Sequence, residues 1–64
     1  MNSHDYYFVR VHIRGERDIT YSNIYKAEFR ETPDDTFFRM FNHLREEYPN
    51  HVIDVLQFNF LCSI

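Results

Sequence analysis

The stretch that decides the fold is Tyr6–Arg14, which reads YYFVRVHIR. From Phe8 onward, apolar and polar side chains alternate with the period of two residues that is typical of a half-buried β-strand. One face, predicted to lie against the core, carries Tyr7, Val9, Val11 and Ile13. The other face is aromatic at one end and basic at the other, and it carries Tyr6, Phe8, Arg10, His12 and Arg14. This second set is predicted to be a surface that contacts a partner.

A second strand is predicted over Ile19–Phe29, because Gly15 and the polar residues after it end the first strand in a turn. Its apolar residues of one parity are Ile19, Tyr21, Tyr25, Ala27 and Phe29. A three-residue loop, Glu16–Asp18, puts both apolar sets on one face, since a shift by one residue would invert every side chain. We therefore expect an odd loop of three or five residues, with Asn23 as a polar residue on the core side.

A helix is predicted to begin after Thr32, because Thr32 can cap it and Pro33 suits its first position. The apolar residues that follow have the spacing of an amphipathic helix, and they are Phe37, Met40, Phe41, Leu44 and Tyr48. Phe38 lies outside this stripe. Pro49 is predicted to end the helix, since the residue before a proline disfavours helical geometry.

The outer face of this helix is predicted to be charged. Its acids lie at the two ends, and they are Asp34, Asp35, Glu46 and Glu47. Asp35 and Arg39 are four residues apart in the order that favours an ion pair. An acidic face can imitate a phosphate backbone, but Arg39 and Arg45 interrupt it, and we interpret it as a solvated face.

A third strand is predicted over Val52–Leu61. Three of its apolar residues alternate with polar ones and are predicted to face the core: Leu56, Phe58 and Phe60. Ile53 and Val55 then face the other way. This conflict of parity predicts either a bulge near Asp54–Leu56 or a strand that is covered on both faces.

Together these elements predict an α+β fold with the order strand, strand, helix, strand (ββαβ). A hairpin followed by a right-handed crossover gives a three-stranded antiparallel sheet in the order second, first, third, with the helix on one face. Residues 1–64 are expected to form one domain, in which residues 1–5 are disordered.

The composition of the chain indicates in which cellular compartment the protein is expected. The chain has 64 residues, a formal net charge of −3 and one cysteine, Cys62. A lone cysteine excludes an intramolecular disulfide and fits a reducing compartment, so we expect a cytoplasmic protein. The N-terminal residues lack an apolar signal core, and no apolar run approaches the ~18 residues that span a membrane. Secretion and membrane insertion are therefore not expected.

Candidate catalytic and metal-binding motifs are weak. The four histidines, His4, His12, His43 and His51, are scattered without a paired spacing, whereas a metal site needs three or four convergent ligands. A single glycine rules out a Gly-rich phosphate-binding loop, and there is no Gly-x-Ser-x-Gly motif. We therefore expect no enzyme activity, no metal and no cofactor.

The open sheet face is the best candidate for function. Ile24 and Lys26 of the second strand join the outer row of Tyr6–Arg14 there. Aromatic residues with arginine are typical of protein-interaction hot spots, and also of sheets on which unstacked bases bind. Because a nucleic-acid binder is usually basic, we predict a protein that binds and modulates or inhibits a partner protein. A small single-stranded nucleic-acid-binding protein is the alternative, and a subunit stable only as an oligomer is a third reading.

The long segment Val52–Ile64 is apolar and low in charge, and an exposed edge of this kind tends to associate. We expect a homodimer through this edge or through the open sheet face. The edge residues predicted to take part are Ile53, Val55, Gln57 and Asn59. The alternative is a monomer whose tail folds back over the edge.

In size, acidic charge and element order, residues 6–61 resemble a loose class of very small phage-encoded proteins that disable a host enzyme. The class includes inhibitors of host RNA polymerase and of uracil-DNA glycosylase. The resemblance implies an inhibitor encoded by a phage or prophage. It rests on topology and size, so no functional residue is transferred from the class.

Overall fold

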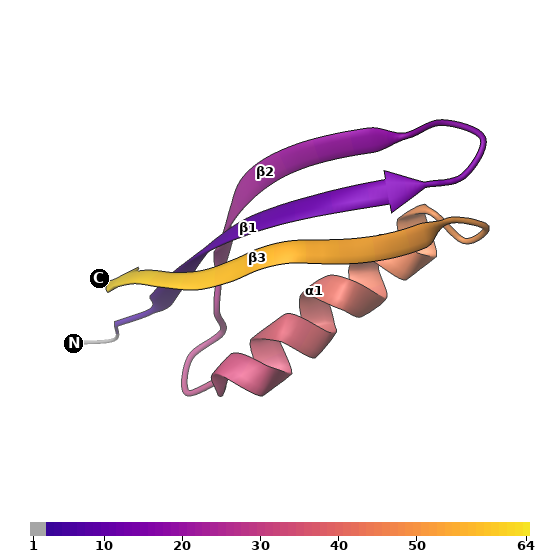
Figure 1. The fold of residues 1–64 in the computed structure, drawn as a ribbon. Coiled ribbons are helices and arrows are strands. Elements are labelled where there is room, and N and C mark those ends of the chain that lie inside the picture. Colours follow the sequence, from indigo (N-terminus) through magenta and orange to yellow (C-terminus); the bar gives the residue numbers. More distant parts are fainter. Residues whose placement is uncertain (1–2) are drawn as a thin grey trace.

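A computed structural model describes residues 3–64. The elements are β1 (Asp5–Arg14), β2 (Ile19–Lys26), α1 (Pro33–Glu47) and β3 (Val52–Ser63). The strands form one antiparallel sheet in the order β2-β1-β3, and α1 lies across one face of it (Figure 1). The predicted ββαβ fold is confirmed, with Tyr6–Arg14 in the central strand.

The hairpin between β1 and β2 has the predicted parity. Ile13 lies opposite Ile19, so the five residues Arg14–Asp18 connect the last pair, and both apolar sets share one face. The odd loop is confirmed, but the register is two residues away from the one that a Glu16–Asp18 loop would give. β2 ends at Lys26 rather than Phe29, because the chain turns away there and Arg30 adopts a left-handed backbone with φ 62°.

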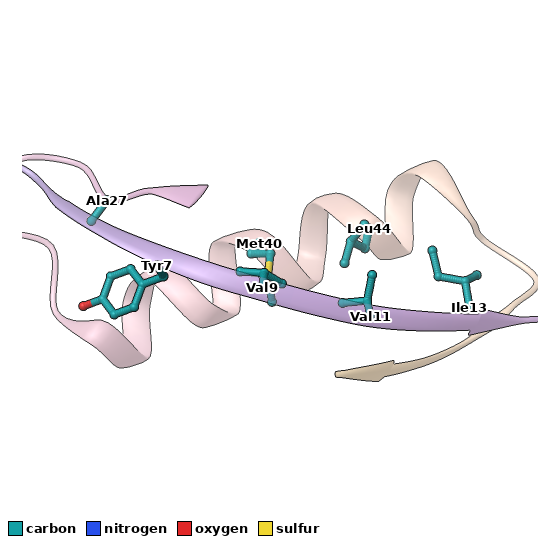
Figure 2. Close-up of a cluster of buried hydrophobic side chains, with 7 residues drawn as sticks. All are labelled: Tyr7, Val9, Val11, Ile13, Ala27, Met40 and Leu44. Carbon is teal, nitrogen blue, oxygen red and sulfur yellow. The ribbon is translucent and has the colours of Figure 1, made fainter. Parts of the chain in front are cut away.

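The core lies between β1 and α1 (Figure 2). Its buried hydrophobic residues are Tyr7, Val9, Val11, Ile13, Ala27, Met40 and Leu44. Val11 and Ile13 are 0% exposed, and full burial of such a side chain stabilises by about 1.5–3 kcal/mol. On the helix the buried residues are Thr36, Met40 and Leu44, whereas Phe37 and Phe41 are only half-buried. The apolar row of β1 is therefore the centre of the core.

The start and end of α1 agree with the sequence pattern. Thr32 is the N-cap, and its hydroxyl oxygen accepts a hydrogen bond from the backbone N–H of Asp35 at 3.2 Å. Pro33 occupies the first turn, and the helix ends at Glu47, before Pro49. Phe38 is exposed, as its place outside the apolar stripe predicts.

Two bulges interrupt the pairing of β3 with β1. The register skips Leu56 and Leu61, so each is an extra residue on β3. The first bulge confirms the prediction for residues 54–56, but the faces of β3 differ from those expected. Ile53 and Val55 pack on the helix side of the sheet, and Leu56 is 53% exposed rather than buried. The prediction was wrong because it continued the alternation of Phe58 and Phe60 back through Leu56 to the start of the strand, whereas this extra residue inverts the faces of the residues before it.

Beyond the first bulge, Phe58 returns to the core side as predicted. Its ring stacks on Tyr7 with 4.5 Å between centroids, and Phe37 meets it edge-on at 5.3 Å. Phe60 also lies on this side, with an edge contact to Tyr7 at 5.9 Å, yet it is 58% exposed. Part of the aromatic surface under β3 is therefore open to solvent.

The beginning of β1 and the end of β3 lie beside each other (Figure 1). The backbones of His4 and Ile64 exchange two hydrogen bonds of 2.8 and 2.9 Å, and the Ser63 hydroxyl donates to Asp5. The His4 ring nitrogen Nδ1 donates to the carbonyl of Ala27 at 2.9 Å. His4 and Asp5 are thus paired rather than disordered, and residues 1–2 of the segment expected to be disordered lie outside the described residues.

At the far end of the sheet, Gly15 packs directly against the ring of His51, which also meets Tyr48 edge-on. The Nδ1 atom of His51 is buried and has no hydrogen-bond partner within residues 3–64. Gly15 does not have a positive φ. This position therefore requires glycine for space and not for backbone conformation.

We expect Gly15→Ala to lower the free energy of unfolding by about 1–3 kcal/mol, because the new methyl group would overlap the His51 ring. Urea denaturation followed by circular dichroism measures this cost. In a His51→Ala background the overlap is gone, and the same substitution should cost less than about 0.5 kcal/mol. An equal cost in both backgrounds would show that the ring is not the obstacle.

Candidate functional site

The candidate site is the face of the sheet that α1 leaves uncovered. We call it the open face. The central row lies on it as predicted and consists of Tyr6, Phe8, Arg10, His12 and Arg14. The register places Lys26 opposite Tyr6 and Ile24 opposite Phe8 on the β2 side. All seven residues predicted for this face are therefore brought together.

The β3 side of the open face differs from the prediction. Asn59 lies opposite Phe8 and Gln57 opposite Arg10, so both predicted amides are on this face. Ile53 and Val55 are not, because the bulge turns them toward the helix. Of the four residues predicted for a self-association edge, these two belong to the core layer.

Asp54 occupies the open face instead. It lies opposite His12, and its carboxylate accepts a hydrogen bond from the Nε of Arg14 at 2.9 Å. Both side chains are about half-exposed, so this ion pair contributes about 1 kcal/mol or less. Its chemical effect is to neutralise the basic end of the row. The sequence pattern missed this because it assigned Asp54 to the wrong face.

The open face has an apolar half and a polar half. Tyr6 and Phe8 are half-buried, and Ile24 beside Phe8 is 59% exposed. Arg10 and Lys26 are exposed and form no ion pair within the described residues. Aromatic residues and arginine are enriched at protein interfaces, and tyrosine and arginine are frequent among the residues that contribute most to binding energy.

Charge is segregated between the two layers of the molecule. The open face carries the cationic side chains of Arg10, Arg14 and Lys26 and the single carboxylate of Asp54. The exposed surface of α1 carries Asp34, Asp35, Arg45, Glu46 and Glu47. The open face is therefore locally positive, although the net charge of the chain is −3.

A second polar cluster lies where β2 leads into α1, and the sequence pattern does not reveal it. Arg39 does not pair with Asp35 as predicted; its Nε donates to Glu31 at 3.0 Å and a terminal nitrogen donates to the carbonyl of Lys26 at 2.9 Å. Glu31 also accepts hydrogen bonds from the Thr36 hydroxyl and from the backbone of Glu28. The partners are eight residues apart, beyond the local spacing that a helix pattern can predict.

The hydrogen bond from Arg39 holds the pKa of Glu31 at about 2, against the opposing effect of burial. The same bond raises the pKa of Arg39. The two carboxylate oxygens of Glu31 accept four hydrogen bonds from three residues of the protein, so both oxygens already have partners. This cluster holds the N-terminal half of α1 against the end of β2, and we interpret its role as structural.

The remaining features offer little for chemistry. The best-defined hollow is shallow and lies on the outside of α1, lined by Asn42, Arg45, Glu46 and Pro49. Within residues 3–64, no three residues among His, Cys, Asp and Glu are grouped as metal ligands. In the same part of the chain, no helix has the length and apolar character needed to cross a membrane.

Comparison with protein-family models, with curated proteins and with solved structures gives no match to this chain.

We expect Glu31→Gln to reduce the pH dependence of stability. In the folded protein the pKa of Glu31 is about 2 and its unperturbed value is 4.5, so the unfolded chain binds more protons between these values. The stabilisation is therefore complete above about pH 4.5 and is lost as the pH falls toward 2. Because Arg39 is about one third exposed, solvent screens part of the interaction, and the loss at pH 7 should be about 1–2 kcal/mol.

Urea unfolding at a series of pH values from about 2.5 to 7 measures this effect. The matched control is Glu16→Gln, which removes an exposed carboxylate in the hairpin loop and should leave the slope unchanged. A Glu31→Gln protein that keeps the wild-type slope of stability against pH would contradict the assignment.

Proposed function

We propose that this protein is a non-enzymatic binding protein that docks its open face on an acidic patch of a partner protein and so modulates or inhibits that partner. The observation that carries the proposal is the aromatic and cationic row on β1, which no other segment of residues 3–64 covers.

The position of this row on the central strand supports a binding role. β1 is paired on both sides over its length, and its opposite face is anchored in the core. The side chains of Tyr6, Phe8 and Arg10 therefore project from a backbone that is already ordered. Because little further order has to be imposed on association, more of the contact energy is available for binding.

The charge distribution supports an acidic protein as the partner. A locally positive face steers association toward negative surfaces, and the acidic surface of α1 disfavours approach from the opposite side. The half-buried rings of Tyr6 and Phe8, with the exposed Ile24, supply apolar contact area. Burial of these groups would provide affinity, and Arg10 and Lys26 would provide orientation.

Single-stranded nucleic acid is the second candidate for this face. It is supported by Tyr6 and Phe8, on which bases can stack, and by the neighbouring amides of Gln57 and Asn59. It is less favoured because Asp54 neutralises Arg14. Arg10 and Lys26 then remain as the cations of this face without an ion pair, whereas affinity for nucleic acid depends on neutralising several phosphates.

The proposed setting is the cytoplasm of a host cell, where the protein would occlude a surface of a host enzyme. The resemblance in size and element order to phage-encoded inhibitors supports this setting. The lone Cys62 is compatible with a reducing compartment.

We expect Arg10→Glu to weaken partner binding by about tenfold or more, because it puts a negative charge in the centre of the face that meets an acidic surface. The matched control is Arg45→Glu, the same exchange at an exposed arginine on the outer side of α1. Partners are captured from cells that carry the gene, and the affinity of each purified partner for the three proteins is measured by calorimetry. A partner that binds wild type and Arg10→Glu equally contradicts the proposed site.

The nucleic-acid alternative is tested in parallel. Fluorescence anisotropy with labelled single-stranded DNA and RNA is measured at low and at physiological salt. Binding that falls steeply with salt and is abolished by Arg10→Glu would replace the protein-partner proposal. The absence of binding at low salt eliminates the alternative.

A further inference from the structure

We propose that two copies of this chain pair antiparallel through the free edge of β3, centred on Asn59, and join their sheets into one six-stranded sheet. This inference is independent of the proposed function, because it concerns the edge of the sheet and not the open face.

The direction of the backbone groups identifies the part of the edge that can pair. His4 and Ile64 exchange two hydrogen bonds, and in an antiparallel pair such residues alternate with ones that point away. Even-numbered residues of β1 therefore direct their backbone toward β3. Asn59 lies opposite Phe8 and Gln57 opposite Arg10, so the backbones of these two β3 residues point to β1.

It follows that the backbone N–H and C=O groups of Phe58 and Phe60 point toward the free edge. These two residues lie between the bulges at Leu56 and Leu61, where the strand keeps a regular register. A second copy related by a two-fold axis at Asn59 would place its Phe60 opposite Phe58 of the first. The backbone N–H and C=O groups of Phe58 in one copy would then pair with the C=O and N–H groups of Phe60 in the other.

The other edge of the sheet is protected and provides a contrast. By the same alternation, the N–H of Ile24 points toward the free edge of β2, and it is already bonded to the side-chain oxygen of Asn23 at 2.8 Å. β2 also ends on Lys26, and lysine is a residue that discourages edge pairing. β3 contains no lysine, arginine or proline, and its one charged residue, Asp54, is paired with Arg14.

The side chains beside this edge form an apolar surface that fits a second copy. Phe60 and Phe38 are 58% and 60% exposed, and Phe38 meets Phe37 edge-on with 6.0 Å between ring centroids. Phe37 in turn contacts Phe58. In the paired arrangement, the rings of Phe58 and Phe60 from both copies lie on the helix side of the joined sheet.

The exposed apolar area is adequate for a dimer of modest stability. With about 200 Å² for a full aromatic side chain, Phe38 and Phe60 each offer about 120 Å². Leu56 and Leu61, each about half-exposed, bring the total to about 400 Å² for each copy, or half of the ~800 Å² that a standard interface buries per partner. The backbone and polar atoms of the paired strands supply the remainder.

The experiment that tests this geometry is a disulfide across the two-fold axis. Asn59 would lie opposite its own copy in a non-hydrogen-bonded pair, where the Cα atoms are about 4.5 Å apart, within the range that a disulfide bridges. In a Cys62→Ser background, Asn59→Cys should form a covalent dimer on mild oxidation. The matched control is Ser22→Cys in the same background, an exposed position on the protected β2 edge, which should form no covalent dimer.

A second variant tests the apolar contact. Phe60→Lys should shift the protein from dimer to monomer in size-exclusion chromatography with light scattering, over protein concentrations from about 10 µM to about 1 mM. Ile24→Lys is the matched control, because Ile24 is equally exposed but lies on the open face, and it should leave the dimer intact. Mixing Phe60→Lys with Phe60→Glu should restore a dimer, since the two positions lie diagonally across the axis.

Wild-type protein that is monomeric at the highest concentration would overturn the proposal. A dimer that is indifferent to Phe60→Lys and is not cross-linked by Asn59→Cys would overturn it as well, since the copies would then meet through another surface. Neither result would affect the binding of a partner to the open face.

Discussion

The structure depends on the burial of one face of β1 beneath α1. Val11 and Ile13 lose all contact with solvent, and Met40 and Leu44 cover the row from the helix. In a chain of 64 residues a single core of this kind must supply most of the stability, since a small domain buries only about 60% of its unfolded surface. β1 is also the strand that joins the other two, so the same residues hold the sheet together and attach the helix.

This arrangement determines which surfaces are available for interaction. One helix can cover one face of a three-stranded sheet, and the alternation of side chains then leaves the second row of β1 in the open. The helix also lies beneath only part of the sheet, so that Phe60 and Phe38 remain exposed next to the unpaired edge of β3. Both candidate surfaces therefore exist because one helix, α1, covers the sheet within residues 3–64.

The parts of the fold that could be predicted from the sequence are those governed by local patterns. The alternation in β1, the cap and proline before α1, and the parity of the hairpin each depend on a few neighbouring residues. The exact hairpin register could not be predicted, because all odd loops preserve the same parity. The bulge at Leu61 was missed because residues 60–62 are all apolar and show no alternation.

The composition of the candidate site was predicted in its central strand and less well at its margins. The row on β1 and its neighbours Ile24 and Lys26 follow from parity alone. The faces of residues 53–55 were assigned by continuing the alternation of Phe58 and Phe60 back along the strand. The extra residue Leu56 inverts the faces of the residues before it, and the apolar pattern does not show that Leu56 is unpaired. The contact between Glu31 and Arg39 depends on the path of the connection after β2, which bends at Arg30 in a conformation that the sequence does not reveal.

The two proposed surfaces are compatible, and their combination has a consequence for binding. Phe58 and Phe60 both belong to the helix side of the sheet, so pairing around Asn59 would match like faces. The joined sheet would then have both helices on one side and both open faces on the other. Two copies of the row on β1 would point in the same direction from one rigid platform. A partner with two acidic patches, or a partner that is itself a two-fold dimer, would engage both rows at once, and the second contact would form at the high effective concentration that the first one provides.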